Sequence, residues 1–386
     1  MDLISGFGAS AAAYILPFLF VLTIVVFFHE LGHFMVARWC GVAVETFSIG
    51  FGREIFGWTD RLGTRWKVGW LPLGGYVKFV GDENEASAPS SERLKRMSPE
   101  EKARSFHAKP VAHRAAVVAA GPIANFLLAI VLFAGIFFWV GERVTPAYVD
   151  EVQSGSAAEQ AGFKPGDRVL AIDGDEIGSF GDMQRIVSLS PGRELAVTVR
   201  REGAELTLLA TPELKEVTDN FGNVHQIGIL GIKRDVSPDQ VETVTYGPIG
   251  AVWMGTKETW FVITRTLDYL GQIIVGTQDA DQLGGPLRIA QVSGQVATFG
   301  FVALLNLTAI LSVSIGLMNL FPVPMLDGGH LLYFGIEAVR GKPLDDQSQQ
   351  MGFRVGLALV MMLMLFATWN DLVHLRVVEF LSGLLS

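Results

Sequence analysis

Four long apolar stretches divide this chain of 386 residues, and polar segments of contrasting character separate them. The apolar stretches lie near positions 14–37, 115–140, 301–321 and 356–368 with its flanks. About 20 apolar residues in a helix cross about 30 Å of hydrocarbon, so each stretch predicts a membrane-spanning helix. Half of the residues are hydrophobic and the mean hydropathy is +0.37. These values indicate a polytopic membrane protein with room for one soluble domain.

The polar segment after the first stretch has two parts. Positions 44–80 form short alternating, aromatic-rich runs broken by glycines. This pattern predicts β-hairpins that lie against or dip into the membrane, or else a soluble hairpin module. Positions 81–109 are charged and rich in Ser, Glu and Pro, which is the composition of a mobile or helical cytoplasmic loop.

A soluble α+β domain is predicted between the second and third stretches, at 145–217. Its pattern contains strands at 148–152, 168–172 and 195–200, helices at 157–161 and 182–189, and turns at 164–167 and 173–174. Further along, the apolar run at 247–274 is interrupted by four charged residues, Lys257, Glu258, Arg265 and Asp268. This mixture favours an amphipathic helix on the membrane surface over a fifth span.

The distribution of charge predicts the orientation in the membrane. Basic residues outnumber acidic ones by 13 to 9 over 38–114, whereas acidic residues outnumber basic ones by 18 to 10 over 141–246. Because loops rich in Lys and Arg stay in the cytoplasm, we expect the first segment to be cytoplasmic and the second extracytoplasmic. Four spans then place both termini outside the cytoplasm. The net charge of -9, with no basic patch interleaved with aromatic residues, argues against nucleic acid as a partner.

The first apolar stretch contains His29-Glu30-Leu31-Gly32-His33, an HExxH motif. Positions i and i+4 share one face of a helix, so His29 and His33 can present two imidazole nitrogens to one Zn²⁺. Zinc lowers the pKa of a bound water to about 7, and Glu30 can then accept its proton, which gives a hydrolase its nucleophile. Ionisable side chains inside a membrane span are costly, so a metal site is the default explanation for three of them.

Asp327 is the best candidate for a third zinc ligand. The single cysteine, Cys40, leaves only histidines and carboxylates as ligands. Asp327 follows the third apolar stretch, where two prolines break the helix, and the predicted orientation brings it to the same membrane face as His33. An Asp-Gly turn that leaves the membrane is the alternative. His330 is a rival ligand, although its position three residues later favours the membrane interface.

Two asparagines lie in or beside apolar stretches. Asn125 follows Gly121-Pro122 in the second stretch, and Asn319 lies near the end of the third. Helix packing through small residues and amide contacts is one explanation. Binding of a substrate backbone, or polarisation of its scissile carbonyl, is the other. The sequence leaves both open.

Together these motifs resemble the bacterial site-2 protease family, the regulator-of-sigma-E type of intramembrane zinc metalloprotease. The resemblance covers almost the whole chain and rests on five segments in order: the HExxH motif, 71–78 (LPLGGYVK), Gly121-Pro122 with Asn125, 283–286 (LGGP), and 319–329 (NLFPVPMLDGG). It implies one zinc ion per chain, bound by His29, His33 and Asp327, with Glu30 as the general base. It also implies substrates that are single-span membrane proteins, such as an anti-sigma factor, cut within or beside their helix.

The resemblance extends to segments outside the metal site. The hairpin that contains Gly74, Gly75 and Tyr76 is similar to the family's membrane-reentrant β region, which is thought to hold substrate as an added strand. With Asn125 and Asn319, these are the expected substrate-binding residues. Residues 145–217 are similar to a periplasmic PDZ domain, which either excludes bulky ectodomains or binds a newly exposed peptide C-terminus.

Two departures from the family pattern stand out. The best-studied enterobacterial members carry tandem PDZ domains, and this chain has room for one. Members often have Phe-Asn where this chain has Phe106-His107, so no role is predicted for His107.

The sequence therefore predicts a polytopic α-helical membrane protein with four transmembrane helices, a membrane-associated β-hairpin region and one extracytoplasmic α+β PDZ domain. The resemblance implies a bacterial inner membrane, an active site towards the cytoplasmic side, and cleavage after a first extracytoplasmic cut. A catalytically inactive membrane-anchored PDZ adaptor is the main alternative, and an ion or proton transporter is another. The expected domains are 1–40 (first transmembrane helix), 41–114 (cytoplasmic β region and charged loop), 115–140 (second helix), 141–220 (PDZ domain), 221–300 (extracytoplasmic connector with the amphipathic helix), 301–330 (third helix with Asp327) and 331–386 (cytoplasmic turn, fourth helix and tail).

Overall fold

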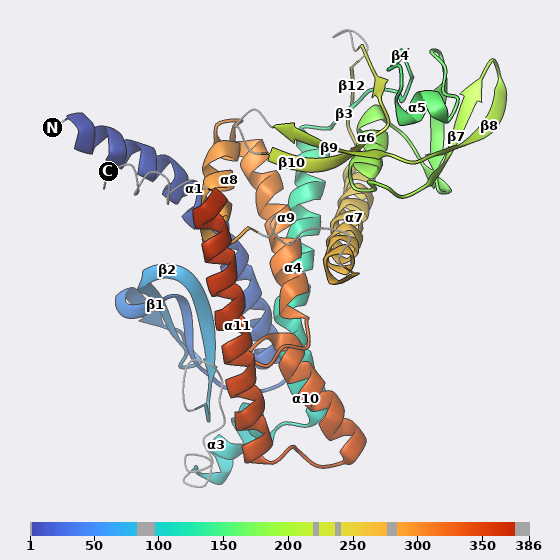
Figure 1. Ribbon diagram of the computed structural model, residues 1–386. Coiled ribbons are helices and arrows are strands. Elements are labelled where there is room, and N and C mark those ends of the chain that lie inside the picture. Colours follow the sequence, from blue (N-terminus) through green and yellow to red (C-terminus); the bar gives the residue numbers. More distant parts are fainter. Residues whose placement is uncertain (1, 83–96, 219–223, 236–240, 276–283, 375–386) are drawn as a thin grey trace. The chain divides into compact units, whose positions relative to one another are not determined.

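The computed structural model describes residues 2–82, 97–218, 224–235, 241–275 and 284–374. The chain divides into two compact units, one made of Met1–Ala134 with Val252–Ser386 and the other of Gly135–Ala251. The first unit contains the long helices, and the second is a smaller α+β body (Figure 1).

Four of the described helices are long and apolar enough to cross a membrane, as the sequence predicts. They are α1 (Asp2–Trp39), α4 (Val111–Trp139), α9 (Phe301–Asn319) and α11 (Asp346–His374). Small residues bring three of them together. A Cβ on Gly32 of α1 would lie only 2.7 Å from Cβ of Ala124 on α4, and a Cβ on Gly316 of α9 would lie 3.0 Å from Cβ of Asn125. Both gaps are below an ordinary contact, so only glycine fits these crossings.

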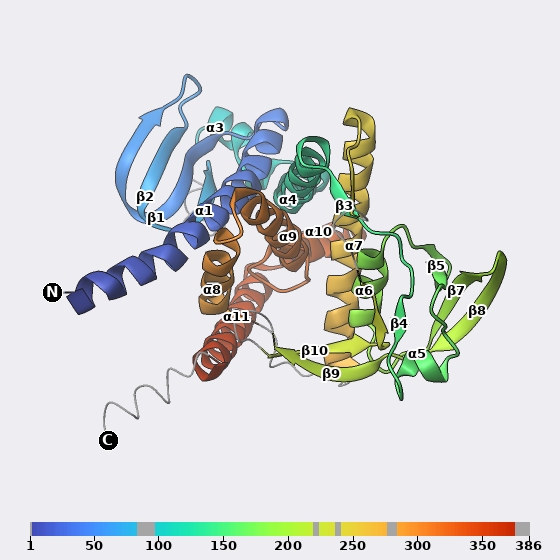
Figure 2. The ribbon, with the colours of Figure 1, turned by 90° about the horizontal axis from the view of Figure 1, so that it is seen from above.

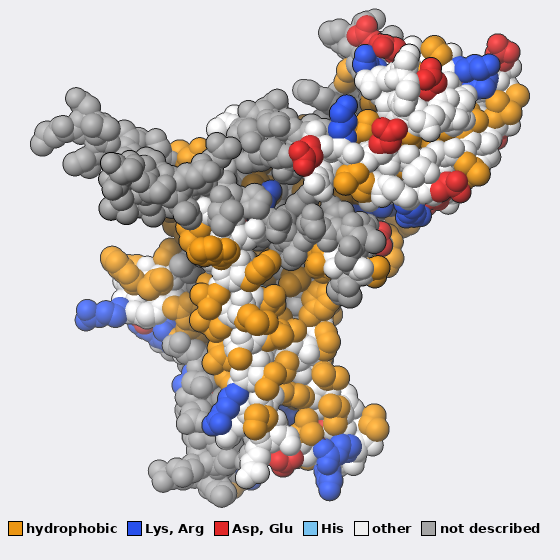
Figure 3. Space-filling model, in the orientation of Figure 1, with side chains coloured by type: hydrophobic (Ala, Val, Ile, Leu, Met, Phe, Trp, Pro, Cys, Tyr) orange, Lys and Arg blue, Asp and Glu red, His pale blue; other side chains and the backbone are white. Residues whose placement is uncertain are grey.

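The fourth helix is joined to the short helix α8 (Pro286–Ala297) through one buried carboxylate. Asp371 of α11 is 1% exposed and accepts hydrogen bonds from the backbone N–H groups of Gly285, Leu287 and Arg288, at 2.8, 3.0 and 3.1 Å. The first N–H groups of a helix need such partners and favour negative charge. The middle of α11 exposes apolar side chains such as Met362 and Leu365, and Figure 3 shows hydrophobic groups along this region.

A break after α9 directs the chain into α10 (Asp327–Arg340). Pro322 and Pro324 lie in the break, and Met325 has a φ of 87°. Cβ atoms on Gly328 and Gly329 would collide with the carbonyl oxygens of the break. Asp327 is thus the first residue of a new helix, whereas the sequence placed it at the end of the third span.

The strands β1 (Val44–Thr59) and β2 (Arg65–Phe79) form a folded hairpin beside α1 (Figure 2). Thr46 pairs with both Arg65 and Lys78, so the first half of β1 lies between the two ends of β2. Among the described residues, 75–79 pair with β1 alone and form an edge of the sheet. The opposite end of the hairpin exposes apolar side chains, including Ile55, Phe56 and Trp70.

The chain leads back to α4 through α3 (Pro99–Arg104) and the 3-10 turn η1 (Phe106–Ala108). Ser98 and Glu101 form a capping box at the start of α3. Much of the predicted cytoplasmic loop, 83–96, lies outside the described residues.

The second unit is built around a four-stranded sheet in the order β6-β5-β7-β8, with core side chains such as Val169, Leu195 and Val197 fully buried. Two helices accompany it, α5 (Ala157–Gln160) and α6 (Phe180–Ser188). The strands of the unit are β3 (Glu142–Val144), β4 (Glu151–Val152), β5 (Arg168–Ile172), β6 (Asp175–Glu176), β7 (Leu195–Arg201), β8 (Ala204–Ala210), β9 (Glu213–Thr218), β10 (Val224–Ile229), β11 (Ile232–Lys233) and β12 (Glu242–Val244).

This unit extends further along the chain than the predicted domain. The strand β11 pairs with β4, and β12 pairs with β3. Residues that the sequence assigns to a connector therefore complete the α+β unit. The unit also contains an ion pair, in which Nε and Nη2 of Arg201 each donate to the buried Asp167 carboxylate at 2.7 Å. Burial alone would raise the pKa of Asp167, but the hydrogen bonds from Arg201 and from the Lys164 backbone outweigh burial and hold this pKa below its usual value.

The helix α7 (Pro248–Val275) corresponds to the predicted amphipathic segment. It is not among the four helices that satisfy the length and hydropathy of a span. It packs along α4, since a Cβ on Gly255 would lie 2.7 Å from the Ile130 carbonyl oxygen and 2.9 Å from the Ala134 nitrogen. Its other face exposes Trp253 and Trp260. This helix therefore contacts the spanning helix α4 directly, and its position on the membrane surface stays a prediction.

Candidate metal centre

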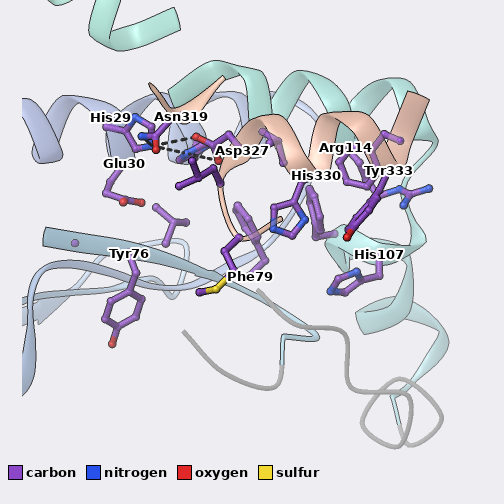
Figure 4. A pocket seen from close by; sticks show the side chains of 18 of the residues that line it. His29, Glu30, Tyr76, Phe79, His107, Arg114, Asn319, Asp327, His330 and Tyr333 are labelled. Carbon is purple, nitrogen blue, oxygen red and sulfur yellow. Dashed lines mark hydrogen bonds and ion pairs between the residues drawn. The ribbon is translucent and has the colours of Figure 1, made fainter. Parts of the chain in front are cut away.

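Two helices bring three predicted ligands into one cluster. His29 and His33 come from α1 and Asp327 from the start of α10, and one ligand atom of each lies within 4.8 Å of the others. The Nε2 atoms of the two histidines are 3.2 Å apart. Nε2 of His29 lies 3.2 Å from Oδ2 of Asp327, and Nε2 of His33 lies 3.6 Å from Oδ1 (Figure 4).

The second nitrogen of each imidazole is held by α4. Nδ1 of His33 is 2.9 Å from the Val117 carbonyl oxygen, and this acceptor requires a proton on Nδ1. Nδ1 of His29 is 3.3 Å from the side-chain nitrogen of Asn125. The Oδ1 atom of the fully buried Asn125 has no hydrogen-bond partner among the described residues. Exchanging the two amide atoms, which have the same shape, pairs Oδ1 with a protonated Nδ1 and removes this deficit.

This arrangement fits a divalent cation. With both Nδ1 atoms protonated, the two Nε2 atoms are lone-pair acceptors that face each other and a carboxylate. Oδ2 of Asp327 also has no hydrogen-bond partner among the described residues. Two neutral imidazoles and one carboxylate form the donor set of hydrolytic zinc sites that keep a fourth position open.

Gly121 of α4 allows this helix to lie directly against both histidine rings. A Cβ on Gly121 of α4 would collide with Nε2 of His33 and would lie 2.9 Å from Cε1 of His29. The sequence predicted that Gly121, with Pro122, loosens the helix or lets helices pack closely, but it did not predict the contact with the histidines. Its neighbour along α4, Asn125, was expected among the substrate-binding residues. Asn125 is instead fully buried behind His29 and is not among the cavity-lining residues.

Glu30 lies beside the cluster but outside it, as a general base should. Its side chain lines the same cavity and points towards β2 (Figure 4). A Cβ on Gly75 would lie 3.2 Å from Cγ of Glu30, so the edge strand meets the base with no room for a side chain. Gly74 and Tyr76 also line this cavity, as does Asn319, whose side-chain nitrogen is 3.5 Å from Nε2 of His29.

Several polar residues of the cavity were assigned no role from the sequence. His330, the rival ligand in the sequence, lines the cavity and lies outside the ligand cluster. Arg114 and Glu337 form an ion pair at 2.5 Å, and His107 pairs with Asp82 at 3.0 Å. The spacing of Asp327, His330 and Glu337 on one helix face is a signal that the sequence did contain.

Comparisons with known proteins agree with this geometry. Residues 17–363 match the model of "Peptidase family M50". The chain is 50% identical over 372 residues to "Putative zinc metalloprotease Atu1380" of Agrobacterium fabrum, and the aligned region covers 96% of this chain and 99% of that protein. It is 51% identical over 360 residues to "Putative zinc metalloprotease R01501" of Rhizobium meliloti, covering 93% and 96%. It is also 42% identical over 388 residues to "Metalloprotease MmpA" of Caulobacter vibrioides, covering 95% and 97%. The chain is thus a zinc metalloprotease and belongs to peptidase family M50.

Proposed function

We propose that the protein is an intramembrane protease that cleaves single-span membrane proteins within or beside their transmembrane segment. One observation carries this proposal. The ligands His29 and His33 and the base Glu30 all lie within Ala12–Trp39, a segment of α1 long and apolar enough to cross a membrane. Peptide bonds cut at such a site must themselves lie in or next to the membrane.

Each residue of the site has its own role in the proposed reaction. His29, His33 and Asp327 hold the metal. When bound, zinc supplies a Lewis acid that polarises the scissile carbonyl and acidifies the attacking water. Glu30 takes a proton from that water and passes it to the amine nitrogen as the C–N bond breaks. Asn319, which lines the cavity beside His29, is positioned to donate a hydrogen bond to the oxygen that gains charge.

Substrate would be presented by the edge of β2. Gly75 meets Glu30, and Gly74, Tyr76 and Val77 continue along the same cavity. A substrate segment unwound from its helix can pair with this edge as an added strand. Pairing satisfies the backbone groups that unwinding exposes, which is essential in a membrane.

The remaining assignments concern placement and regulation. The proposed location is the bacterial inner membrane. The charge asymmetry supports an orientation with the α+β unit outside the cytoplasm and the site towards the cytoplasm. The sheet β6-β5-β7-β8 with α5 and α6 supports the assignment of that unit as a single PDZ domain. It would exclude bulky ectodomains or bind a peptide C-terminus exposed by a first cut. An anti-sigma factor is the substrate class that we propose.

The catalytic proposal is tested with Glu30→Gln. This change keeps the size of the side chain and removes the base, so the variant is expected to retain one zinc per chain and to lose cleavage of a single-span substrate in detergent. Zinc content near zero in the wild-type protein would favour an inactive adaptor or a transporter. Near wild-type turnover in the variant would remove Glu30 from the mechanism.

The role of the α+β unit is tested by replacing 145–241 with a short Gly-Ser linker. The strands β3 and β12 pair with each other at the ends of this segment, so they can still close the gap. Zinc content is expected to stay unchanged. If the unit excludes bulky substrates, the variant will cleave full-length substrate faster. If it binds a C-terminus, the variant will cleave trimmed substrate more slowly. Loss of zinc would contradict both roles.

A further inference from the structure

The cavity of about 540 Å³ at the metal centre continues well beyond the catalytic residues. At one end are His29, Glu30 and Gly75. At the other end are His107, Arg114, His330 and Tyr333 (Figure 4), together with Glu337, which forms an ion pair with Arg114. We call these five polar side chains the polar arm. The catalytic steps use none of these five residues.

Part of the polar arm is fixed by its own contacts. Nε2 of His107 is 3.0 Å from Oδ1 of Asp82, and Asp82 is fully buried and also accepts from the Phe79 backbone N–H at 3.0 Å. Arg114 donates to Glu337 at 2.5 Å and to the Lys109 carbonyl oxygen at 3.0 Å. Each charge of the Arg114–Glu337 pair is therefore compensated within the protein.

The other part offers free hydrogen-bonding groups. His330 and Tyr333 both line the cavity, and among the described residues no hydrogen bond to the His330 imidazole or the Tyr333 hydroxyl is found. The Tyr333 hydroxyl lies against Gly352 of α11. Asp327 and His330 lie three residues apart on α10, so His330 shares the helix face that supplies the metal ligand. A hydroxyl and an imidazole can each donate or accept a hydrogen bond. Such a pair suits an uncharged polar group better than an apolar or a charged one.

The edge of β2 determines how many residues separate the scissile bond from the substrate residue that His330 and Tyr333 contact. Gly75 meets Glu30, and Phe79 stacks on Phe106, which directly precedes His107. A strand advances by about 3.3 Å per residue, so the four steps from Gly75 to Phe79 cover about 13 Å. Antiparallel pairing outnumbers parallel pairing in sheets. An antiparallel substrate strand would have its amino-terminal side towards Phe79. Side chains alternate between the two faces of a strand, so a substrate residue four positions from the one opposite Gly75 points to the same face as that residue.

We propose that the polar arm is a specificity subsite for an uncharged polar side chain (Ser, Thr, Asn or Gln) about four residues on the amino-terminal side of the scissile bond. His330 and Tyr333 would bind this side chain, and His107 and the Arg114–Glu337 pair would form the wall of the subsite. The inference rests on the proposed proteolytic function.

The experiment uses the full-length protein in detergent and one single-span substrate in four versions, with Asn, Ser, Leu or Lys at that position. For the wild-type protein, kcat/KM is expected to be roughly two- to tenfold higher for Asn and Ser than for Leu, the range of a neutral hydrogen bond. Tyr333→Phe and His330→Phe should bring this ratio towards one. His330→Gln, which keeps a donor and an acceptor, should restore much of it. Val339→Ala is the matched control, because Val339 lies on α10 and is 90% exposed.

The outcomes separate this inference from the proposed function. Equal cleavage of all four versions by the wild-type protein, or an unchanged ratio in both Phe variants, would overturn the subsite and leave the protease intact. A preference that appears only on the carboxyl-terminal side would also overturn it as stated. No cleavage of any version by zinc-loaded protein would overturn the proposed function, and the subsite with it.

Discussion

Gly121→Ala is the most direct test of how the metal centre is built. An added Cβ would collide with Nε2 of His33 and lie 2.9 Å from Cε1 of His29. Carbon atoms rest at about 3.5 to 4.0 Å from one another, so the rings must move by about 1 Å or α4 must retreat. Zinc ligands tolerate errors of only about 0.2 Å. We therefore expect zinc affinity to fall by at least about 100-fold and the free energy of unfolding to fall by about 1 to 3 kcal/mol.

The assay measures zinc in purified protein and its release to a competing chelator, with thermal unfolding followed in parallel. Gly335→Ala is the matched control, because a Cβ on Gly335 of α10 would meet no atom within 4 Å. The control should bind zinc as the wild-type protein does. A Gly121→Ala protein that binds one zinc with unchanged affinity would refute the idea that this contact places the histidines.

Four further substitutions test the metal centre and the α+β unit. Asn125→Ala removes the amide behind His29 and should weaken zinc binding by roughly 10- to 100-fold in chelator competition; unchanged affinity would show that the ring needs no such support. Metal analysis should find zinc lost in Asp327→Asn and kept in His330→Ala, and the reverse would exclude Asp327 as the third ligand. Asp167→Asn should destabilise the α+β unit by about 2 kcal/mol at neutral pH, measured by amide exchange in the full chain. The folded-state pKa of Asp167 lies below its usual value, so this contribution is complete above the unfolded pKa of about 3.9 and is lost as pH falls through the folded pKa. A difference between Asn variant and wild type that persists well below that pH would contradict the assignment.

The sequence predicted the ligand cluster because its signals are local. The spacing of His29 and His33 places both on one helix face, and the proline break before Asp327 marked where a carboxylate could approach them. The structure brings these three residues together. The role of Asn125 was beyond prediction, because it depends on how α1 and α4 cross, and no periodicity within one helix encodes that crossing.

The extent of the α+β unit was also beyond the reach of sequence patterns. The strand β11 has two residues and β12 has three, too few to show alternation. Their partners β4 and β3 lie far earlier in the chain. Such pairings are determined by tertiary packing, and a short strand carries little propensity of its own. The same holds for α10, whose beginning depends on contacts between Gly328 and the carbonyl oxygens of the preceding break.

The positions of the glycines explain why the HExxH motif and an aspartate are not sufficient to form a zinc site. An HExxH pair and an aspartate fix which atoms can bind zinc, but their mutual placement depends on backbones that approach closely. Gly121 lies against the histidines, and Gly328 lies against the Leu320 and Phe321 carbonyl oxygens beside Asp327. Hydrophobic burial cannot hold these contacts in a membrane, because lipid is as apolar as the helix surface, so close packing must do so. A chain that kept the three ligands and replaced these glycines would have the donor set without the geometry that zinc requires.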